Sequence, residues 1–206
     1  TTTHEIRQHE LRYNFEGIKK IGNLLKPHSK KIKFIIVTNP SEEITNYLQH
    51  VLNHKNVLGF GTELDAKRYS KILGRKVLCL GPHGRAFPLI NANSKETYDS
   101  LLRKSDNEII KHLREKGIQH KLVGLGFKDF FEKLNSKKDI VHVCSYLKKP
   151  FLGVKNIAIS APFEIENGKV IKPAKIKVNK IEKERFKELA RDLKISVNKL
   201  IKENIN

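Results

Sequence analysis

The sequence has no methionine among its 206 residues and only two cysteines. Its apolar runs stay well short of the roughly 18 residues that a membrane-spanning helix needs, and no charged segment followed by an apolar one marks a signal peptide. We therefore expect a cytoplasmic protein without a membrane partner. Because no methionine opens the chain, which starts with TTTHEIR, we also expect a truncated or processed piece of a longer protein.

The two cysteines, Cys79 and Cys144, are isolated in the apolar, strand-like runs VLCL and VHVCSY. A free cysteine in such surroundings usually behaves as a small hydrophobic side chain. We predict neither a disulfide nor a metal site.

The charge is strongly basic, with 41 Lys and Arg against 22 Asp and Glu, for a net charge of +19. Clustered positive charge would indicate a nucleic-acid partner, because binding to phosphates releases counterions. Here the charge is spread along the chain and lysine greatly outnumbers arginine. This favours a solvated surface with only non-specific affinity for polyanions.

Apolar spacing and turn residues predict alternating helices and strands. The expected helices are 5–25, 41–53 with Ser41 as N-cap, 62–73, 95–117 with a break near Ser105, 123–134 and 181–204. The expected strands are 33–38, 57–60, 76–80, 86–91, 140–147, 154–165 and 169–178, the last two joined by a hairpin turn at 166–168. This order indicates an α/β fold that begins with an α/β segment at the N-terminus, followed by mixed helices, an antiparallel meander and a closing helix.

Polar residues at strand ends and helix starts form a candidate site. A planar, permanently charged arginine such as Arg68 suits the carboxylate of a substrate. His83 in GPHG can donate a proton near neutral pH, and Asp65 can fix its tautomer and stabilise its imidazolium. Arg7 can stabilise negative charge on a carbonyl oxygen, and Asn39 follows a strand in VTNP. Because Asp65 and Arg68 are three residues apart, they share one helix face. The pattern indicates hydride-transfer chemistry on a 2-oxo or 2-hydroxy acid.

Five segments in order along the chain resemble the L-lactate and malate dehydrogenase family. They are RQHELRYN (7–14), VTNPSEEIT (37–45), VLGFGTELDAKR (57–68), GPHG (81–84) and SAPFEIENGKV (160–170). The resemblance implies the C-terminal remnant of a Rossmann nucleotide-binding domain at residues 1–60, followed by the family's α+β catalytic domain at 61–206. It also implies NAD as cofactor with NADP left open, malate or lactate as the 2-hydroxy acid substrate, and a homodimer or homotetramer.

The same resemblance implies a role for each candidate residue. Arg7 would lie on a mobile loop and polarise the carbonyl, and Arg68 would bind the substrate carboxylate. Asp65 and His83 would relay the proton. Asn39 would hydrogen-bond the substrate beside the nicotinamide, and Val123 would lie near the nicotinamide ring.

The chain also departs from the family pattern. It has no G-x-G-x-x-G loop and no ribose-binding acidic residue, so we expect the cofactor half of the site outside this chain. Thr1 falls at the position that usually holds the specificity-determining Gln or Arg, and Gln119 stands where a small hydroxyl residue is usual. His83 is followed by Gly84-Arg85 in place of Gly-Asp, which puts another cation near the histidine.

Two other functions stay open at this point. The missing glycine loop, Arg85 and the basic charge would also fit a degenerate, non-catalytic relative that serves as a basic binding module. A glycosidase of the same architecture is a third possibility, but the sequence lacks the cysteine and histidine metal ligands that it would need.

Overall fold

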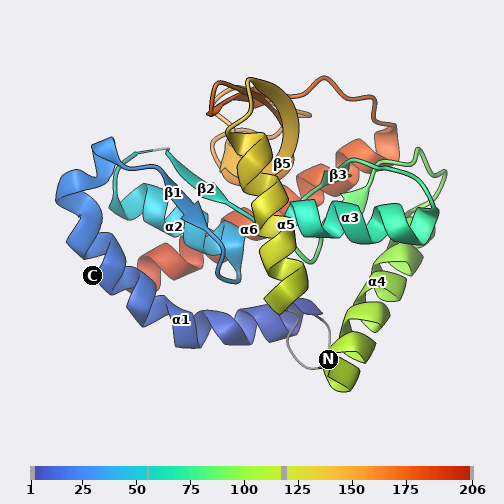
Figure 1. Ribbon diagram of the computed structural model, residues 1–206, viewed down its shortest axis with the longest axis horizontal. Helices are drawn as coiled ribbons and strands as arrows, with labels where there is room; N and C mark the ends of the chain where they lie inside the picture. The colour runs from blue at the N-terminus through green and yellow to red at the C-terminus, as the bar shows by residue number, and fades with distance from the viewer. Residues whose placement is uncertain (1–2, 55, 117–119, 205–206) are drawn as a thin grey trace.

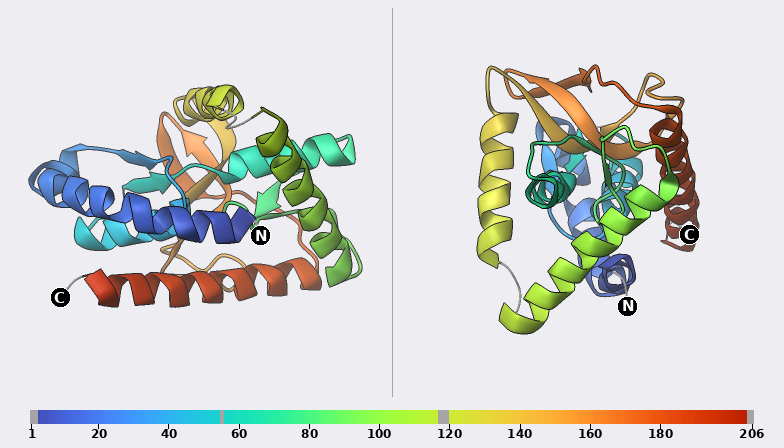
Figure 2. Two further views of the ribbon diagram at one scale, coloured as in Figure 1. Left: turned by 90° about the horizontal axis from the view of Figure 1, so that it is seen from below. Right: turned by 90° about the vertical axis from the view of Figure 1, so that its right-hand side faces the viewer.

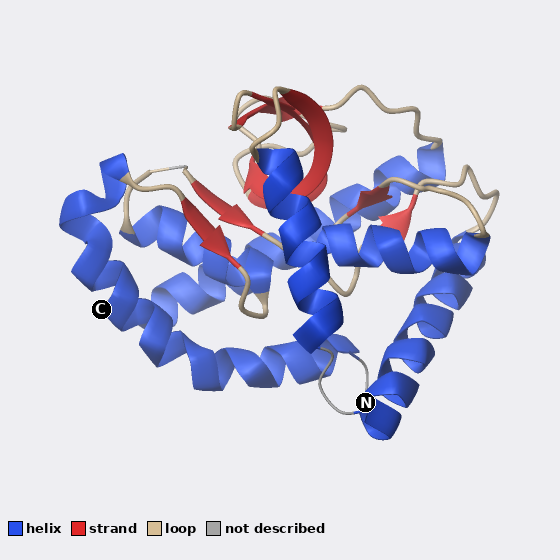
Figure 3. Ribbon diagram, in the orientation of Figure 1, coloured by secondary structure: helices blue, strands red, loops and turns tan. Residues whose placement is uncertain are grey.

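The structure is a computed structural model that describes residues 3–54, 56–116 and 120–204 (Figure 1). The helices are α1 (Thr3–Leu25), η1 (Lys26–Lys31, a 3-10 helix), α2 (Ser41–Val51), α3 (Thr62–Leu73), α4 (Lys95–Lys116), α5 (His120–Leu134) and α6 (Lys180–Asn204). The strands are β1 (Phe34–Ile36), β2 (Val57–Gly59), β3 (Cys79–Leu80), β4 (Phe87–Pro88), β5 (Lys138–Tyr146), β6 (Ala158–Glu166) and β7 (Lys169–Pro173). The predicted α/β fold is confirmed. Helices alternate with short strands in the N-terminal half of the chain, and a meander of longer strands follows in the C-terminal half (Figure 3).

The main sheet has five strands in the order β1-β2-β5-β6-β7. Strands β1 and β2 are parallel, and α2 crosses between them, as expected for a βαβ unit. The remaining pairs are antiparallel. The turn between β6 and β7 has positive φ at Asn167 (49°) and Gly168 (75°), which is the geometry that the predicted hairpin requires.

The largest core lies around the β5–β6 hairpin. Helices α5 and α6 lie on opposite sides of these strands (Figure 2, right). Phe130 of α5 and Phe186 of α6 are fully buried in the same cluster as Val143 and Ile159 of the strands. Because both faces are covered, β6 is buried along almost its whole length.

A second core holds α1 and α2 beside the parallel strands. The rings of Phe15 and Tyr47 meet edge to face with centroids 4.7 Å apart, and Ile44 and Leu48 are buried in the same cluster. This packing fixes the first turn of α2, which begins two residues after Asn39.

The structure departs from the predicted elements in several places. Helix α4 runs without a break through Ser105, which is buried on the packed side of the helix. The N-cap of α2 is Pro40, and Ser41 is the first helical residue, with its hydroxyl donating to the Glu42 carboxylate. Strands 76–80 and 86–91 shorten to two residues each, in which Cys79 pairs with Pro88 and Leu80 with Phe87. The predicted domain boundary near residue 60 stays a prediction.

None of the helices formed by the described residues is long and apolar enough to cross a membrane.

We predict that Phe130→Ala lowers the free energy of unfolding by about 3–5 kcal/mol, because it leaves a cavity where a fully buried ring packs against two other core aromatics. The neighbouring residue supplies the control, since Phe131 is 51% exposed and Phe131→Ala should cost about 1 kcal/mol or less. Urea denaturation measures both values, and equal losses would contradict the assignment of the core.

Candidate active site

The carboxylate of Asp65 brings three parts of the candidate site together. Its Oδ2 lies 2.8 Å from His83 Nδ1 and accepts a hydrogen bond of 3.0 Å from the backbone N–H of Gly84. Its Oδ1 accepts one of 3.0 Å from the Arg68 guanidinium. Side chains of Asp65 and His83 are only 6% and 8% exposed. An ionised carboxylate is only an acceptor, so Nδ1 of His83 carries the proton in this pair.

The backbone before and after α3 explains this arrangement. Gly61 precedes the helix at φ 155°, and a Cβ at this position would lie 2.4 Å from the Cγ of His83. Only glycine therefore lets the imidazole pack against this turn. At the other end the helix closes on Gly74 in the left-handed conformation, as the sequence predicted. Arg68 lies one turn after Asp65, on the same face.

Asn39 lies at the same edge of the sheet as this cluster. Strands β1 and β2 are parallel, and Phe60 N–H donates to Ile36 O, so the chain leaves both strands at one edge. Asn39 follows β1, and Gly61, which touches His83, follows β2. The half-buried Asn39 accepts a hydrogen bond of 3.3 Å on its carbonyl oxygen from the Asn14 side chain of α1.

Arg85 does not join the cluster as a second cation. Its guanidinium forms an ion pair of 2.6 Å with Asp192 on α6. This contact ties the loop after His83 to the last helix.

The other predicted site residues lie further away or outside the described part. Val123 lies in α5 and packs, partly buried, against the main core. The backbone of Arg7 belongs to α1, as the helical spacing predicted, and not to a loop, as the family resemblance implies. The side chain of Arg7, together with Thr1 and Gln119, lies outside what the structure describes.

A second histidine–carboxylate pair, which the sequence did not indicate, lies on the other side of α3. Glu63 Oε2 is 2.7 Å from His142 Nδ1 and also accepts from the backbone N–H of His142. The backbone N–H of Cys79 donates to His142 Nε2 at 3.0 Å, so this ring nitrogen serves as an acceptor inside the protein. Lys133 of α5 binds the other oxygen of Glu63. In the sequence Glu63 appeared as an ordinary acidic residue in a first helical turn.

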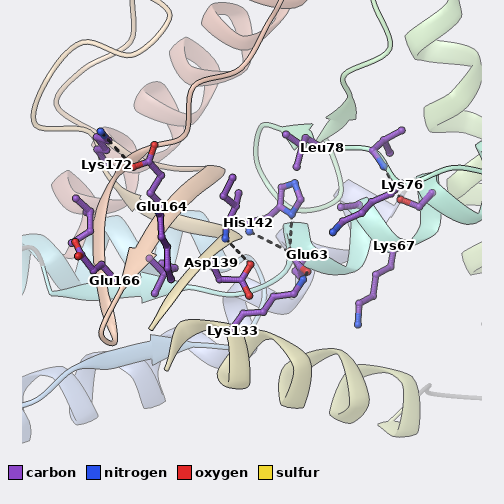
Figure 4. Close-up of a pocket in the computed structure, with 17 residues that line it drawn as sticks. Glu63, Lys67, Lys76, Leu78, Lys133, Asp139, His142, Glu164, Glu166 and Lys172 are labelled. Atoms are coloured by element: carbon purple, nitrogen blue, oxygen red, sulfur yellow. Dashed lines mark hydrogen bonds and ion pairs between the residues drawn. The ribbon is translucent and has the colours of Figure 1, made fainter. Parts of the chain in front are cut away.

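This second pair lies in the wall of a cavity of about 890 Å³ between α3, α5 and the β5–β7 meander (Figure 4). Figure 4 shows Lys133 reaching Glu63 from below and His142 meeting it from the strand. The residues that line this cavity do not include Asp65, Arg68 or His83. Glu63 and Asp65 are two residues apart on α3, so they point to opposite faces of the helix.

The electrostatics of Glu63 follow from these contacts. Burial alone raises the pKa of this carboxyl. The hydrogen bonds from His142 and Lys133, together with the charge of Lys133, outweigh burial and lower the pKa to about 2. The carboxylate therefore stays ionised across the physiological range.

Both cysteines are buried and free, as predicted from their apolar runs. Burial raises the pKa of both thiols well above the ordinary value. Within residues 3–54, 56–116 and 120–204, no group of three His, Cys, Asp or Glu side chains is arranged to hold a metal ion.

Comparison with solved structures identifies the fold as that of malate dehydrogenases. The enzyme from Aeropyrum pernix aligns with a TM-score of 0.73 at 21% identity, over 92% of this chain and 72% of that one. The enzyme from Archaeoglobus fulgidus, solved in complex with NADH, aligns with a TM-score of 0.75 at 19% identity, over 91% and 68%. The enzyme from Plasmodium falciparum aligns with a TM-score of 0.78 at 17% identity, over 94% and 71%.

Two characterised sequence relatives agree with this fold. The malate dehydrogenase of Picrophilus torridus is 24% identical over 88% of this chain, and L-lactate dehydrogenase 2 of Clostridium acetobutylicum is 27% identical over 86%. The chain spans 65% and 66% of the lengths of these two relatives. No known family profile matches the chain. This chain is therefore similar in sequence to malate and L-lactate dehydrogenases over part of their length and has the fold of malate dehydrogenases.

We predict that Glu63→Gln lowers the free energy of unfolding at pH 7 by about 3 kcal/mol, as expected for a carboxyl whose pKa falls from 4.5 to about 2 on folding. Because the folded pKa lies below the unfolded one, this stabilisation is complete above about pH 4.5 and is lost as the pH falls toward 2. Urea denaturation at pH 7 and pH 3 measures it.

The difference in the free energy of unfolding between the original chain and Glu63→Gln should thus shrink by more than half between pH 7 and pH 3. Glu132→Gln is the matched control, because that side chain is 62% exposed and pairs only loosely with Lys128 at 3.7 Å. If Glu63→Gln lowered the free energy of unfolding equally at both pH values, the contacts of ionised Glu63 with His142 and Lys133 would be ruled out as the source of the loss.

Proposed function

We propose that this chain forms the substrate half of the active site of an NAD-dependent dehydrogenase acting on an L-2-hydroxy acid, malate or lactate. The observation that supports this most strongly is the joining of Asp65, His83 and Arg68 through one buried carboxylate. An acid–base group and an anion-binding group then lie at the same sheet edge as Asn39. These are the groups that interconversion of a 2-hydroxy acid and a 2-oxo acid requires.

In this proposal His83 moves the proton. Its Nδ1–H donates to Asp65, and Nε2 is the nitrogen that we propose exchanges a proton with the substrate oxygen. In the reducing direction the imidazolium gives its Nε2 proton to the oxygen that was the carbonyl. In the oxidising direction the neutral imidazole takes the proton from the hydroxyl group. Asp65 stabilises the charged form in both directions.

Arg68 holds the substrate carboxylate. One guanidinium nitrogen, Nη1, donates to Asp65, and the side chain is 28% exposed, so part of the fork faces solvent. The planar fork suits a carboxylate, and its charge never titrates in the working range. Following the family resemblance, Arg7 would polarise the carbonyl, and Asn39 would hydrogen-bond the substrate.

The residues present fit only one end of the cofactor. When bound, the nicotinamide of NAD supplies or accepts the hydride. Asn39 and Val123 are the residues that the resemblance assigns to that end, while the sequence has no glycine-rich loop for the diphosphate. We therefore propose that the diphosphate-binding segment is not part of this chain. We also propose that the working enzyme is a homodimer or homotetramer, as the family resemblance implies.

We predict that the natural gene product containing this chain reduces oxaloacetate or pyruvate with NADH, and that His83→Asn lowers kcat by about 10²–10⁴-fold, since the proton donor is lost. NADH binding, followed by fluorescence, should not change. Full turnover by His83→Asn would remove His83 from the mechanism. A protein with no turnover on any 2-oxo acid would instead support the non-catalytic binding module.

We predict that Arg68→Lys raises KM for the 2-oxo acid about 10–100-fold, because a point charge replaces the bidentate fork. Steady-state kinetics in the same gene product measures this. Arg75→Lys, at an exposed position just after α3, is the matched control and should leave KM unchanged. Equal KM values for the two variants would argue against carboxylate binding by Arg68.

A further inference from the structure

Residues 79–84, which we call the histidine segment, carry His83 with little regular backbone pairing. Within this segment only Cys79 and Leu80 form a strand, β3, and its partner β4 is equally short. A segment with so few ladder hydrogen bonds needs other contacts to hold it in one place. Those contacts come from the first turn of α3 and from the β5–β6 hairpin.

The middle of the histidine segment is fixed at Gly81. Its backbone N–H donates a hydrogen bond of 3.0 Å to the carbonyl oxygen of Ser160 on β6, and its own carbonyl oxygen accepts one of 3.2 Å from the hydroxyl of Thr62, the first residue of α3. Ser160 is itself fixed, because its hydroxyl donates to the buried Glu42 carboxylate at 2.5 Å. Gly81 is thus held between a strand of the main sheet and the helix that carries Asp65.

The beginning of the histidine segment is fixed by a side chain, His142 of β5. The backbone N–H of Cys79, four residues before His83, donates to His142 Nε2 at 3.0 Å. Cys79 is fully buried and His142 is 5% exposed, so water cannot replace this acceptor without an opening of the structure. A buried N–H that loses its acceptor costs free energy. The imidazole therefore does for β3 what the backbone of a neighbouring strand does in a longer sheet.

Glu63 determines how His142 meets Cys79. Its Oε2 lies 2.7 Å from His142 Nδ1 and accepts from the backbone N–H of His142 at 3.2 Å, while Lys133 binds the other oxygen. A carboxylate on one ring nitrogen orients the imidazole and favours the tautomer that carries its proton there, which makes the other nitrogen an acceptor. The contact with Cys79 therefore depends on an acid in the first turn of α3.

We propose that His142, oriented by Glu63, is a positioning residue for His83. Thr62, Glu63 and Asp65 lie in one helical turn and reach the middle, the beginning and the end of the histidine segment. His142 is the link to the beginning, so the geometry of the candidate acid–base pair is held from a single helix. The catalytic meaning of this role rests on the proposed function, whereas the contacts are a property of this chain alone.

Native-state hydrogen exchange in this chain, without cofactor or substrate, tests the proposal. The reporter is the Gly84 amide, which donates to the same Asp65 oxygen that His83 contacts. The Phe186 amide in α6 reports opening of the whole fold. His142→Phe keeps a ring and removes both ring nitrogens. We expect it to raise the exchange rate of Gly84 about 10-fold or more relative to that of Phe186.

Two further variants serve as controls. His142→Gln is the conservative one, because its amide offers a donor and an acceptor, and it should bring the ratio of the two exchange rates back toward the original value. Gln49→Leu is the matched control. That side chain is 1% exposed and donates to the Val57 carbonyl at 2.9 Å, between α2 and β2. Its loss should speed exchange at both amides alike and leave the ratio unchanged.

Equal acceleration of Gly84 and Phe186 in His142→Phe would overturn the proposal, since that is the result of a purely structural role. If His142→Phe does not fold, exchange in the original chain at increasing urea concentration decides. We expect Cys79 and Gly84 to open together, with one free energy of opening, and two separate values would refute the link. Because no turnover is measured, failure here is distinct from failure of the proposed dehydrogenase activity.

Discussion

The carboxylate of Asp65 is the constraint on which the rest of the site depends. It is nearly buried, and an ionised group in that position is tolerated only when donors surround it. Arg68, His83 and the Gly84 N–H supply those donors. All three come from segments whose backbone must be held accurately, and the surrounding fold meets that requirement. Gly61 makes room for the imidazole, and Thr62 and β6 hold the loop that delivers it.

Helix α3 positions two acids for different purposes. Asp65 points toward the sheet edge and binds His83, whose Nε2 exchanges the proton in the proposed mechanism. Glu63 points the other way and binds His142, whose Nε2 accepts from the Cys79 backbone. The same pair of residue types is therefore a candidate acid–base centre on one face and an internal ion network on the other.

The sequence predicted the parts of the structure that depend on local spacing or on a motif. The helical spacing gave α1, α3 and α6 nearly to the residue, and Gly74 ended α3 as expected. The contact between Asp65 and Arg68 followed from their separation of three residues. The pairing of Asp65 with His83 came from the chemistry of the two side chains and from the family resemblance, not from spacing, because 18 residues separate them along the chain.

Long-range contacts between residues with no motif could not be predicted. Nothing near Glu63 in sequence indicates His142, which is 79 residues away, and nothing near Glu42 indicates Ser160, 118 residues away. Arg85 suggested a cation beside His83, but its partner on α6 turns it away. The length of β3 and β4 was overestimated since an apolar run does not reveal how far its partner strand extends.

The most direct test of the account is the tautomer and protonation midpoint of His83, measured from the ring ¹⁵N signals of this chain and of Asp65→Asn. The account predicts that Nδ1 carries the proton of the neutral ring in the original chain. It predicts that Asp65→Asn lowers the protonation midpoint by about one pH unit or more, because the nearest negative charge is gone. The same tautomer and the same midpoint in both proteins would contradict it.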